Sequence, residues 1–269
     1  MKKILALFGI SLFFMGCQDE NSLHFKKHEG FNQETAQTHV SQWYSEMDNK
    51  VSDAINSIDF SNTVFKLKSE DLPSLYSTNG NFKFYPALES TDNGNLNFYC
   101  FIQRGDGALL PLYPELQDSS IVTPLKIRSS EFENTGFLTE AMEKTLKERL
   151  NQVTKTELIK QFTSQDTNER VEYFEMFEKD YPSIVIDGIT YFGAFEETET
   201  ITSLGIQFGL HESGEENLHG EQYTIPITTI LQIQRSADNS GNYRSDNSQN
   251  TNLSYDYSNP CPPCQAGIN

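Results

Sequence analysis

The chain has 269 residues and a formal net charge of −18, with 19 phenylalanines and 12 tyrosines. A charge this negative, without a cluster of lysine or arginine, excludes a surface that binds nucleic-acid phosphates or lies flat on anionic lipid. The length allows one large domain or two small ones, and the aromatic content predicts a folded protein rich in strands.

The first segment of the chain has the three parts of a secretory signal. Two lysines after Met1 are followed by an apolar stretch from Ile4 to Met15 and then by the small residue Gly16. This order of basic, apolar and small residues is typical of a signal peptide. The apolar stretch is shorter than the roughly 20 residues that span a bilayer. The sequence therefore predicts that residues 1–16 direct export.

The pair Gly16-Cys17 resembles the lipobox of bacterial lipoproteins, although the two residues before it depart from the usual pattern. The resemblance implies that Cys17 is acylated and that the chain contacts the membrane through this lipid anchor. Residues 18–20, Gln-Asp-Glu, resemble the acidic export signal of surface lipoproteins of the Bacteroidota. Together these features imply an outer-membrane protein exposed at the cell surface, with residues 17–31 as a polar tether. The alternative is a buried amino-terminal helix with an incidental cysteine.

A single long helix is expected after Asn32, which is a plausible N-cap. Apolar residues recur there at steps of three and four, which predicts an amphipathic helix of about seven turns. The apolar positions are Val40, Trp43, Met47, Val51, Ala54 and Ile58. Trp43 is the only tryptophan, and we expect it to anchor the core.

Short strand-like runs broken by turn residues follow, and they predict an antiparallel meander. The runs are TVFKLK, NFKFYPAL, LNFYCFIQ, ALLPLY and IVTPLKIR. Asn-Gly and Asp-Gly pairs between them tolerate the positive φ of tight turns. Pro86, Pro111 and Pro124 indicate edges or bulges. With the first helix, these strands make up a region of residues 32–134.

The next region, residues 135–235, begins with a helical period. Leucines and other apolar residues predict a helix from Leu138 to about Phe162. Asp166 and Glu169 have the spacing of a capping box and predict a third helix, which Pro182 ends. Its apolar residues would be Val171, Phe174 and Phe177.

Strands are expected again after the third helix. The stretch SIVIDGITYFGAF holds two apolar runs joined by Asp187-Gly188, which predicts a β-hairpin. Apolar residues then alternate over residues 204–210 and 223–233, as in half-buried strands. Residues 236–269 are rich in Ser, Asn and Asp, and we expect this low-complexity tail not to fold alone.

The predicted fold class is α+β, with antiparallel sheets made of a meander and hairpins. About three amphipathic helices would pack on these sheets. A helix followed by strands occurs twice, so two lobes divided near Asn134 are possible on this pattern. One continuous domain explains the same pattern.

Cys261 and Cys264 have the C-x-x-C spacing of redox centres, but the neighbouring prolines do not favour the helix N-terminus that such chemistry needs. Export to an oxidising compartment favours a structural disulfide. If Cys17 is acylated, three cysteines remain. Either the tail pair closes on itself and Cys100 stays a buried thiol, or Cys100 pairs with a tail cysteine. In the second case one thiol is left for a partner.

Imidazoles and carboxylates lie close together in the stretch HESGEENLHGE. His211, His219, Glu215 and Glu216 could bind a divalent cation. The alternative is a solvated loop between two strands, because the stretch also holds turn residues. No cofactor is otherwise expected.

The tripeptide Arg104-Gly105-Asp106 resembles the integrin-binding motif of adhesion proteins, and a hairpin tip would expose it. A tight turn selects glycine and aspartate for backbone reasons alone, which is the alternative.

The sequence contains no P-loop, Rossmann glycine pattern, Gly-x-Ser-x-Gly elbow or His-Glu-x-x-His pair. We therefore expect a non-catalytic surface lipoprotein whose body binds an unknown protein or glycan partner. One alternative is a surface hydrolase of glycan or peptide that uses carboxylates or the His/Glu metal site. Another is an envelope assembly protein linked to its neighbours by a disulfide.

Overall fold

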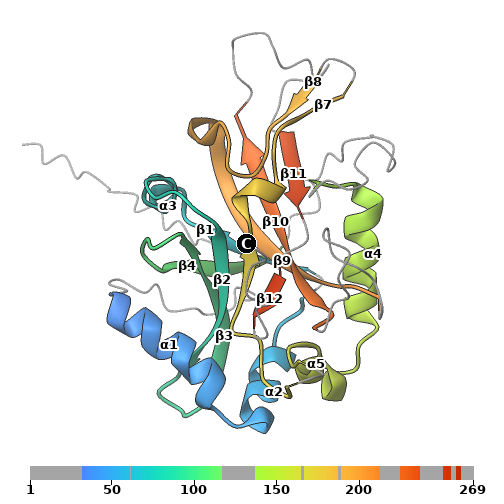
Figure 1. Cartoon of the computed structure of the whole chain (residues 1–269). Coiled ribbons are helices and arrows are strands. Elements are labelled where there is room, and N and C mark those ends of the chain that lie inside the picture. Colours follow the sequence, from blue (N-terminus) through green and yellow to red (C-terminus); the bar gives the residue numbers. More distant parts are fainter. Residues whose placement is uncertain are drawn as a thin grey trace, which may run out of the picture. The chain divides into compact units, whose positions relative to one another are not determined.

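The fold is built on one curved antiparallel sheet (Figure 1). The computed structural model describes residues 32–60, 62–116, 137–164, 167–186, 189–212, 225–236, 251–255 and 259–261. All described residues belong to one compact unit. The α+β class is therefore confirmed, with helices beside an antiparallel sheet.

Ten strands of the described residues join in the order β12-β6-β2-β3-β4-β1-β9-β10-β11-β5. They are β1 (Thr63–Leu67), β2 (Phe82–Ser90), β3 (Leu96–Arg104), β4 (Leu110–Leu116), β5 (Phe137–Leu138), β6 (Tyr173–Met176), β9 (Ile201–Leu210), β10 (Ile227–Arg235), β11 (Thr251–Tyr255) and β12 (Asn259–Cys261). A separate pair is formed by β7 (Ile184–Ile186) and β8 (Ile189–Tyr191).

The described residues contain five α-helices, not the three that were expected. They are α1 (Gln33–Ser45), α2 (Asp48–Asn56), α3 (Leu72–Tyr76), α4 (Glu140–Asn151) and α5 (Lys155–Gln161). Helix α1 packs along β2, α4 packs along β9, and α2 lies beside α5 (Figure 1). No helix of the described residues is both long and apolar enough to cross a bilayer.

The seven strands from β6 to β10 form a nearly closed barrel. Phe174 of β6 and Phe208 of β9 meet across the interior, with ring centroids 5.9 Å apart. The carboxyl-terminal segment lies at the seam, since β11 pairs with β10 and β12 pairs with β6. Residues 251–255 and 259–261 of the predicted tail thus pair with the sheet, which does not conflict with the expectation that the tail does not fold alone. Their backbones are paired with β10 and β6, the outer strands of the barrel.

Aromatic rings fill the interior of the barrel. The Phe208 ring lies 5.3 Å from Phe60, 5.8 Å from Phe65 and 5.6 Å from Phe162, measured between centroids. Trp43 is fully buried against Phe98 and donates its indole N–H to the carbonyl of Val171 at 2.8 Å. Trp43 is thus a core anchor, as predicted. Each buried ring contributes about 2–3 kcal/mol.

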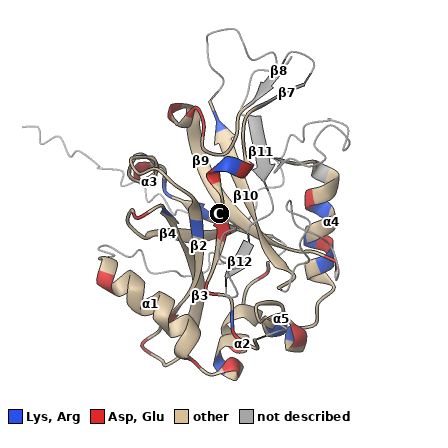
Figure 2. Cartoon of the chain, viewed as in Figure 1, with Lys and Arg blue, Asp and Glu red and all other residues tan. Residues whose placement is uncertain are grey.

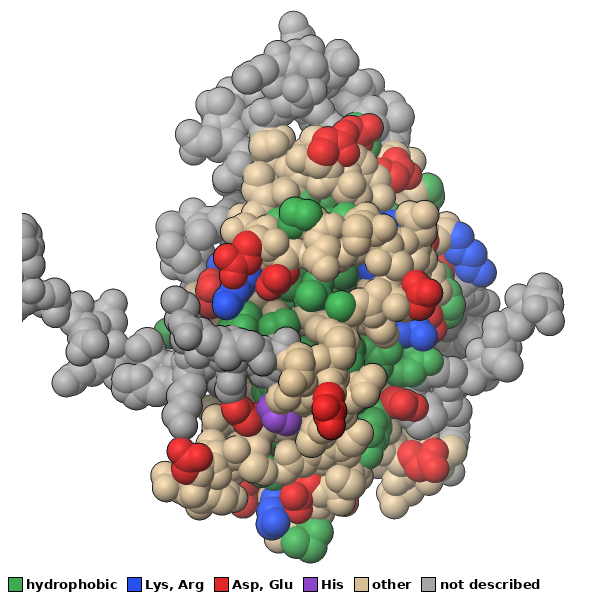
Figure 3. All heavy atoms as spheres, turned by 90° about the vertical axis from the view of Figure 1, so that its left-hand side faces the viewer, with side chains coloured by type: hydrophobic (Ala, Val, Ile, Leu, Met, Phe, Trp, Pro, Cys, Tyr) green, Lys and Arg blue, Asp and Glu red, His purple; other side chains and the backbone are tan. Residues whose placement is uncertain are grey.

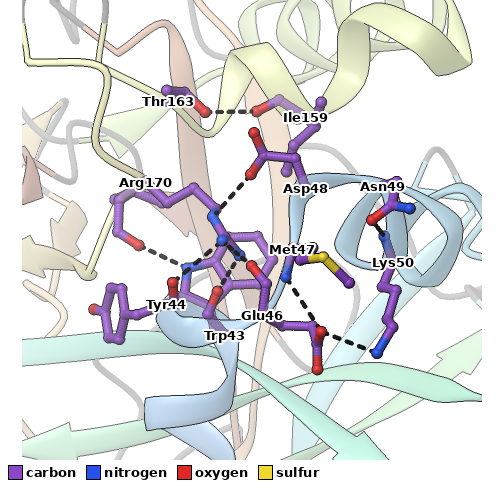
Figure 4. Close-up of polar contacts among 11 residues, drawn as sticks. Trp43, Tyr44, Glu46, Met47, Asp48, Asn49, Lys50, Ile159, Thr163 and Arg170 are labelled. Carbon is purple, nitrogen blue, oxygen red and sulfur yellow. Dashed lines mark hydrogen bonds and ion pairs between the residues drawn. The ribbon is translucent and has the colours of Figure 1, made fainter. Parts of the chain in front are cut away.

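The first predicted helix is interrupted, which corrects the sequence interpretation. Glu46 and Met47 have extended backbones, so α1 ends at Ser45 and α2 starts at Asp48. Arg170 donates to the carbonyls of Trp43, Tyr44 and Glu46, as Figure 4 shows, and so binds the carbonyls that a continuing helix would use. Met47 is 60% exposed and does not belong to the core stripe.

The second and third predicted helices also differ from the structure. The second is divided into α4 and α5, with Thr154 as the N-cap of α5. The third is wrong, because Tyr173–Met176 form strand β6, which pairs with β2 in the register Phe84↔Phe174. Its apolar residues alternate and are buried on one side of the sheet, so the period is two rather than 3.6. Asp166 lies outside the described residues.

The predicted meander is confirmed for β2 to β4, whereas β1 pairs with β4 and β9 instead of β2. The run IVTPLKIR lies outside the described residues. Pro86 lies beyond the residues of β2 that pair with β6, and Pro111 lies beyond the residues of β4 that pair with β1. Among the described strands, each proline therefore has a neighbour on one side only, as at a sheet edge. The β7–β8 hairpin has the expected register Ile186↔Ile189. Asp187-Gly188 and Pro124 are outside the described residues.

Strands from both predicted lobes belong to the same sheet. Phe65 of β1 lies opposite Ile206 of β9, so the two regions that would meet near Asn134 share backbone pairing. Charged residues lie mainly on helices and on segments between strands (Figure 2). Within the described residues, strands of the two predicted regions are joined in one sheet.

Candidate functional site

The outward side of β2 and β6, next to α1, carries tyrosines together with charged side chains. Successive residues of a strand point to opposite faces, so Lys83 and Tyr85 lie outside while Phe82 and Phe84 are buried. Lys83 lies opposite Glu175 of β6, which sets the register of this surface. We call the following residues the tyrosine face: Tyr44, Lys83, Tyr85, Glu172, Tyr173 and Glu175.

The side chains of the tyrosine face contact one another across strands. The rings of Tyr85 and Tyr173 have centroids 5.4 Å apart at an interplanar angle of 46°. Lys83 Nζ lies 4.8 Å from the centroid of the Tyr173 ring and 4.0 Å from Glu175 Oε1. This position allows a cation–π contact and an ion pair at the same time. The ammonium of Lys83 thus lies on an aromatic face beside a carboxylate.

Two amides fix this arrangement. Asn81 Nδ2 donates to Glu175 Oε1 at 3.0 Å, and the hydroxyl of Tyr85 donates to Gln103 Oε1 at 2.9 Å. Both bonds hold side chains on rigid strands.

The phenols of the tyrosine face are protonated at neutral pH. Burial raises the pKa of Tyr85 to about 12, and the negative charges of Tyr173, Glu172 and Glu175 raise it further. Burial also raises the pKa of Tyr44 and of Tyr173, with a further contribution from Glu172 in both cases. These phenols cannot act as general bases or nucleophiles near neutrality. The rings of Tyr85 and Tyr173, which are half-buried, offer aromatic surface for binding.

Tyr44 and Glu172 have few polar contacts. The Tyr44 hydroxyl is buried and has no hydrogen-bond partner among the described residues. Glu172 is exposed and forms no ion pair with any residue that the structure describes. The carboxylate of Glu172, which precedes Tyr173 in the chain, nevertheless contributes to the raised pKa of all three tyrosines of the face.

Helix α1 borders the tyrosine face and is fixed to the sheet by polar contacts. Gln33 makes two hydrogen bonds with the backbone of Leu109, and His39 Nδ1 bonds the hydroxyl of Tyr99. A shallow hollow of about 450 Å³ follows the exposed side of α1. Its lining is Glu34, Gln37, Thr38, Ser41, Gln42 and Ser45. Figure 3 shows acidic side chains scattered singly over one side of the molecule, without one large acidic patch.

The predicted recognition tripeptide is not presented as an exposed motif. Arg104 ends β3 and is only 4% exposed, with its guanidinium 5.3 Å from the ring centroids of both Tyr76 and Phe195. The expectation that the turn exposes the whole tripeptide is therefore wrong for Arg104, although Asp106 is exposed. Gly105 has φ +53, and a Cβ there would lie 2.2 Å from the carbonyl oxygen of Asn79. The backbone explanation for glycine is thus confirmed.

The metal candidates are only partly described. His211 follows β9 and is buried, and its backbone N–H donates to the carbonyl of Pro226 at 2.9 Å. His219, Glu215 and Glu216 lie outside the described residues. Within the described part of the chain, no group of three or more His, Cys, Asp or Glu side chains could hold a metal ion. The cation site remains a prediction.

The sheet order restricts the cysteine pairing. Cys100 points inward from β3 as a buried thiol, and burial raises its pKa well above the ordinary value. Cys261 ends β12, which is three strands away in the order β3-β2-β6-β12. Neighbouring strands are about 4.8 Å apart, so the two Cα atoms are separated by roughly 14 Å, and a disulfide needs less than about 7 Å. A bond between Cys100 and Cys261 does not fit this fold, whereas Cys17 and Cys264 lie outside the described residues.

Sequence reasoning missed the tyrosine face. The alternation of aromatic and polar residues in NFKFYPAL could have indicated that Lys83 and Tyr85 share the outer side. The contribution of Tyr173 and Glu175 could not follow, because that segment was predicted as a helix.

A scan of protein-family models and searches of curated proteins and solved structures found no match to the chain.

Proposed function

We propose that this chain is a lipid-anchored protein of the cell envelope that binds a partner protein or glycan, without catalysis, through the tyrosine face. The observation that carries the binding part is the contact between the Tyr85 and Tyr173 rings on neighbouring strands. Tyr85 is bonded to Gln103, and Tyr173 lies under the ammonium of Lys83. Tyrosine is enriched at protein interfaces, since it offers a large ring and a polar hydroxyl with little loss of side-chain entropy.

The lipid anchor rests on the sequence. The pair Gly16-Cys17 after a short apolar segment resembles a lipobox, and Gln18-Asp19-Glu20 resembles a surface export signal. The first described helix begins at Gln33, after the segment expected to be the tether. Stable attachment needs more than one acyl chain.

Metabolic labelling with an alkyne fatty acid tests the anchor. We expect label on the wild-type protein in the outer-membrane fraction and none on Cys17→Ser. Protease treatment of intact cells should digest the wild-type protein. Unlabelled wild-type protein would refute the anchor, and full protection from protease would refute surface exposure.

Cross-linking on intact cells tests the binding surface, because Lys83 supplies a reactive amine within the tyrosine face. We expect cross-linked peptides that contain Lys83, and we expect them to be lost in the double variant Tyr85→Ala, Tyr173→Ala. A matched control is Tyr113→Ala, which removes another half-buried tyrosine of the same sheet, one that carries Lys68 on its ring at 4.6 Å. Equal loss in the control, with all variants folded, would count against the tyrosine face.

A further inference from the structure

Lys83 shows what kind of group the tyrosine face accommodates. Its ammonium lies on the Tyr173 ring and beside Glu175, so the chain itself supplies a cation to a phenol–carboxylate pair. A cation over a tyrosine face is attracted by the ring quadrupole, and a nearby carboxylate adds a Coulombic contribution.

A second pair of a phenol ring and a carboxylate occurs next to Lys83, and this carboxylate has no bound cation among the described residues. Tyr85 contacts Tyr173, and Glu172 directly precedes Tyr173 in the chain. The charge of Glu172 contributes to the raised pKa of Tyr85, Tyr173 and Tyr44. Glu172 is exposed and has no ion pair among the residues that the structure describes, whereas Glu175 is already bonded to Lys83 and Asn81. The face therefore carries one more carboxylate than it has bound cations.

Arg170 does not supply the missing cation. It lies close enough to Tyr44 for their charges to interact, but its guanidinium donates to the carbonyls of Trp43, Tyr44 and Glu46 (Figure 4). Its Nε also lies 3.5 Å from Asp48 Oδ1. These contacts hold the guanidinium of Arg170 at the junction of α1 and α2.

We infer that the partner of the tyrosine face is a basic protein and that a lysine ammonium of this partner lies against Tyr85, Tyr173 and Glu172, where Lys83 competes with it. This inference rests on the proposed function and specifies the chemistry of the partner. The formal charge of −18 favours the approach of a basic partner and disfavours an acidic one. A neutral glycan would gain no Coulombic attraction from the carboxylate of Glu172, which could serve it only as a hydrogen-bond acceptor.

A short peptide with a single lysine tests the inference, with a norleucine peptide of the same length as the uncharged control. Binding is measured by NMR titration of the purified protein from residue 18 onward. We expect the lysine peptide to bind, the norleucine peptide not to bind, and Tyr173→Leu to abolish binding. Glu172→Gln should weaken binding by about fivefold to tenfold, since it removes the carboxylate beside the rings.

The variant Lys83→Met gives the sharper result, because the competing ammonium is lost. We expect affinity for the lysine peptide to rise by about tenfold. Lys144→Met makes the same change of net charge on α4, where Lys144 pairs with Glu148 at 3.7 Å on the protein surface. Long-range electrostatics alone would produce equal effects in the two variants, whereas the local site predicts an effect for Lys83 only.

The outcomes separate this inference from the proposed function. Equal gains for Lys83→Met and Lys144→Met, or equal binding of the lysine and norleucine peptides, would overturn the inference. If cross-links through Lys83 depend on the tyrosines while no lysine peptide binds, the binding surface stands and the cationic partner is refuted. A glycan that binds in a tyrosine-dependent manner, without any dependence on Glu172, would also refute it.

Discussion

Replacing Tyr44 by phenylalanine should stabilise the folded chain. The Tyr44 hydroxyl is buried and has no hydrogen-bond partner among the described residues. An unsatisfied buried hydroxyl costs about 1–3 kcal/mol, because its bonds to water are lost on folding and not replaced. Phenylalanine keeps the ring and removes that cost. We expect the free energy of unfolding to rise by about 1–2 kcal/mol, or a rise in Tm of roughly 2–6 °C for a domain of this size.

Tyr85→Phe is the matched control, since it removes a hydroxyl that does have a partner. The Tyr85 hydroxyl donates to Gln103 Oε1 at 2.9 Å, while Gln103 Nε2 donates to the carbonyl of Gly107 at 2.7 Å. Loss of the first bond should lower the free energy of unfolding by about 0.5–1.5 kcal/mol. Each variant lacks one hydroxyl oxygen of the tyrosine face. The two variants are predicted to shift the free energy of unfolding in opposite directions.

Urea unfolding, followed by tryptophan fluorescence of Trp43, measures both variants. The free energies come from linear extrapolation, and an unchanged m-value shows that the surface exposed on unfolding is the same. If Tyr44→Phe destabilises the chain as much as Tyr85→Phe does, then the Tyr44 hydroxyl has a partner, such as a bound water, and the reasoning is refuted.

Three further predictions concern pH, the tail and the buried thiol. Folding raises the pKa of Tyr44, Tyr85 and Tyr173, so the folded state keeps protons that the unfolded state releases above about pH 10. The contribution of these groups to the free energy of unfolding should be fully present below this pH and should be lost as pH rises through it. Urea unfolding at about pH 8 and about pH 11 would give the same free energy if these shifts were absent. A chain that ends at Ser236 loses β11 and β12 and exposes the edges of β10 and β6; we expect a lower Tm and aggregation, and an unchanged monomer with the same Tm would show that the tail strands contribute nothing. Cys100 should resist a maleimide in the folded protein and react in urea, because its thiol is buried and its pKa is raised; rapid labelling of the native protein, mapped by mass spectrometry, would contradict this burial.

The strands of the meander could be predicted because their signals are local. In β2 the buried residues alternate from Phe82 to Pro86, β3 is a short apolar run, and glycine-containing turns separate the runs. The interruption between α1 and α2 could not be predicted, since it depends on Arg170, which is 126 positions away from Tyr44 in the chain. The apolar period continues through the interruption, so periodicity alone favours one helix.

Strand β6 shows why the site was harder to predict than the fold. Its sequence, YFEM, is short enough to satisfy either a helical or an extended pattern, and the nearby capping-box spacing favoured the helix. Only the pairing with β2 places Tyr173 and Glu175 beside Tyr85 and Lys83. A surface that consists of cross-strand neighbours depends on register, and register is a property of the assembled sheet.

The distribution of phenylalanine and tyrosine offers a way to read such a sheet from its sequence. In β2, Phe82 and Phe84 point inward, whereas the next aromatic residue, Tyr85, points outward. A phenylalanine satisfies a dry interior, but a tyrosine hydroxyl there needs a hydrogen-bond partner. Tyr99 obeys the same rule, because it lies outside and its hydroxyl bonds His39 of α1.

Phe101 is the informative exception to this division. It lies on the outer side with Tyr99, whose ring centroid is 5.2 Å away, and yet it is fully buried. Tyr99 is itself only 5% exposed, so Phe101 and Tyr99 together mark the part of the outer side that other elements cover. Tyr85, which lies opposite Phe101 on β2, is half-buried and marks the accessible part. The proposed binding surface then follows from where a hydroxyl is tolerated, independently of the ion pairs around it.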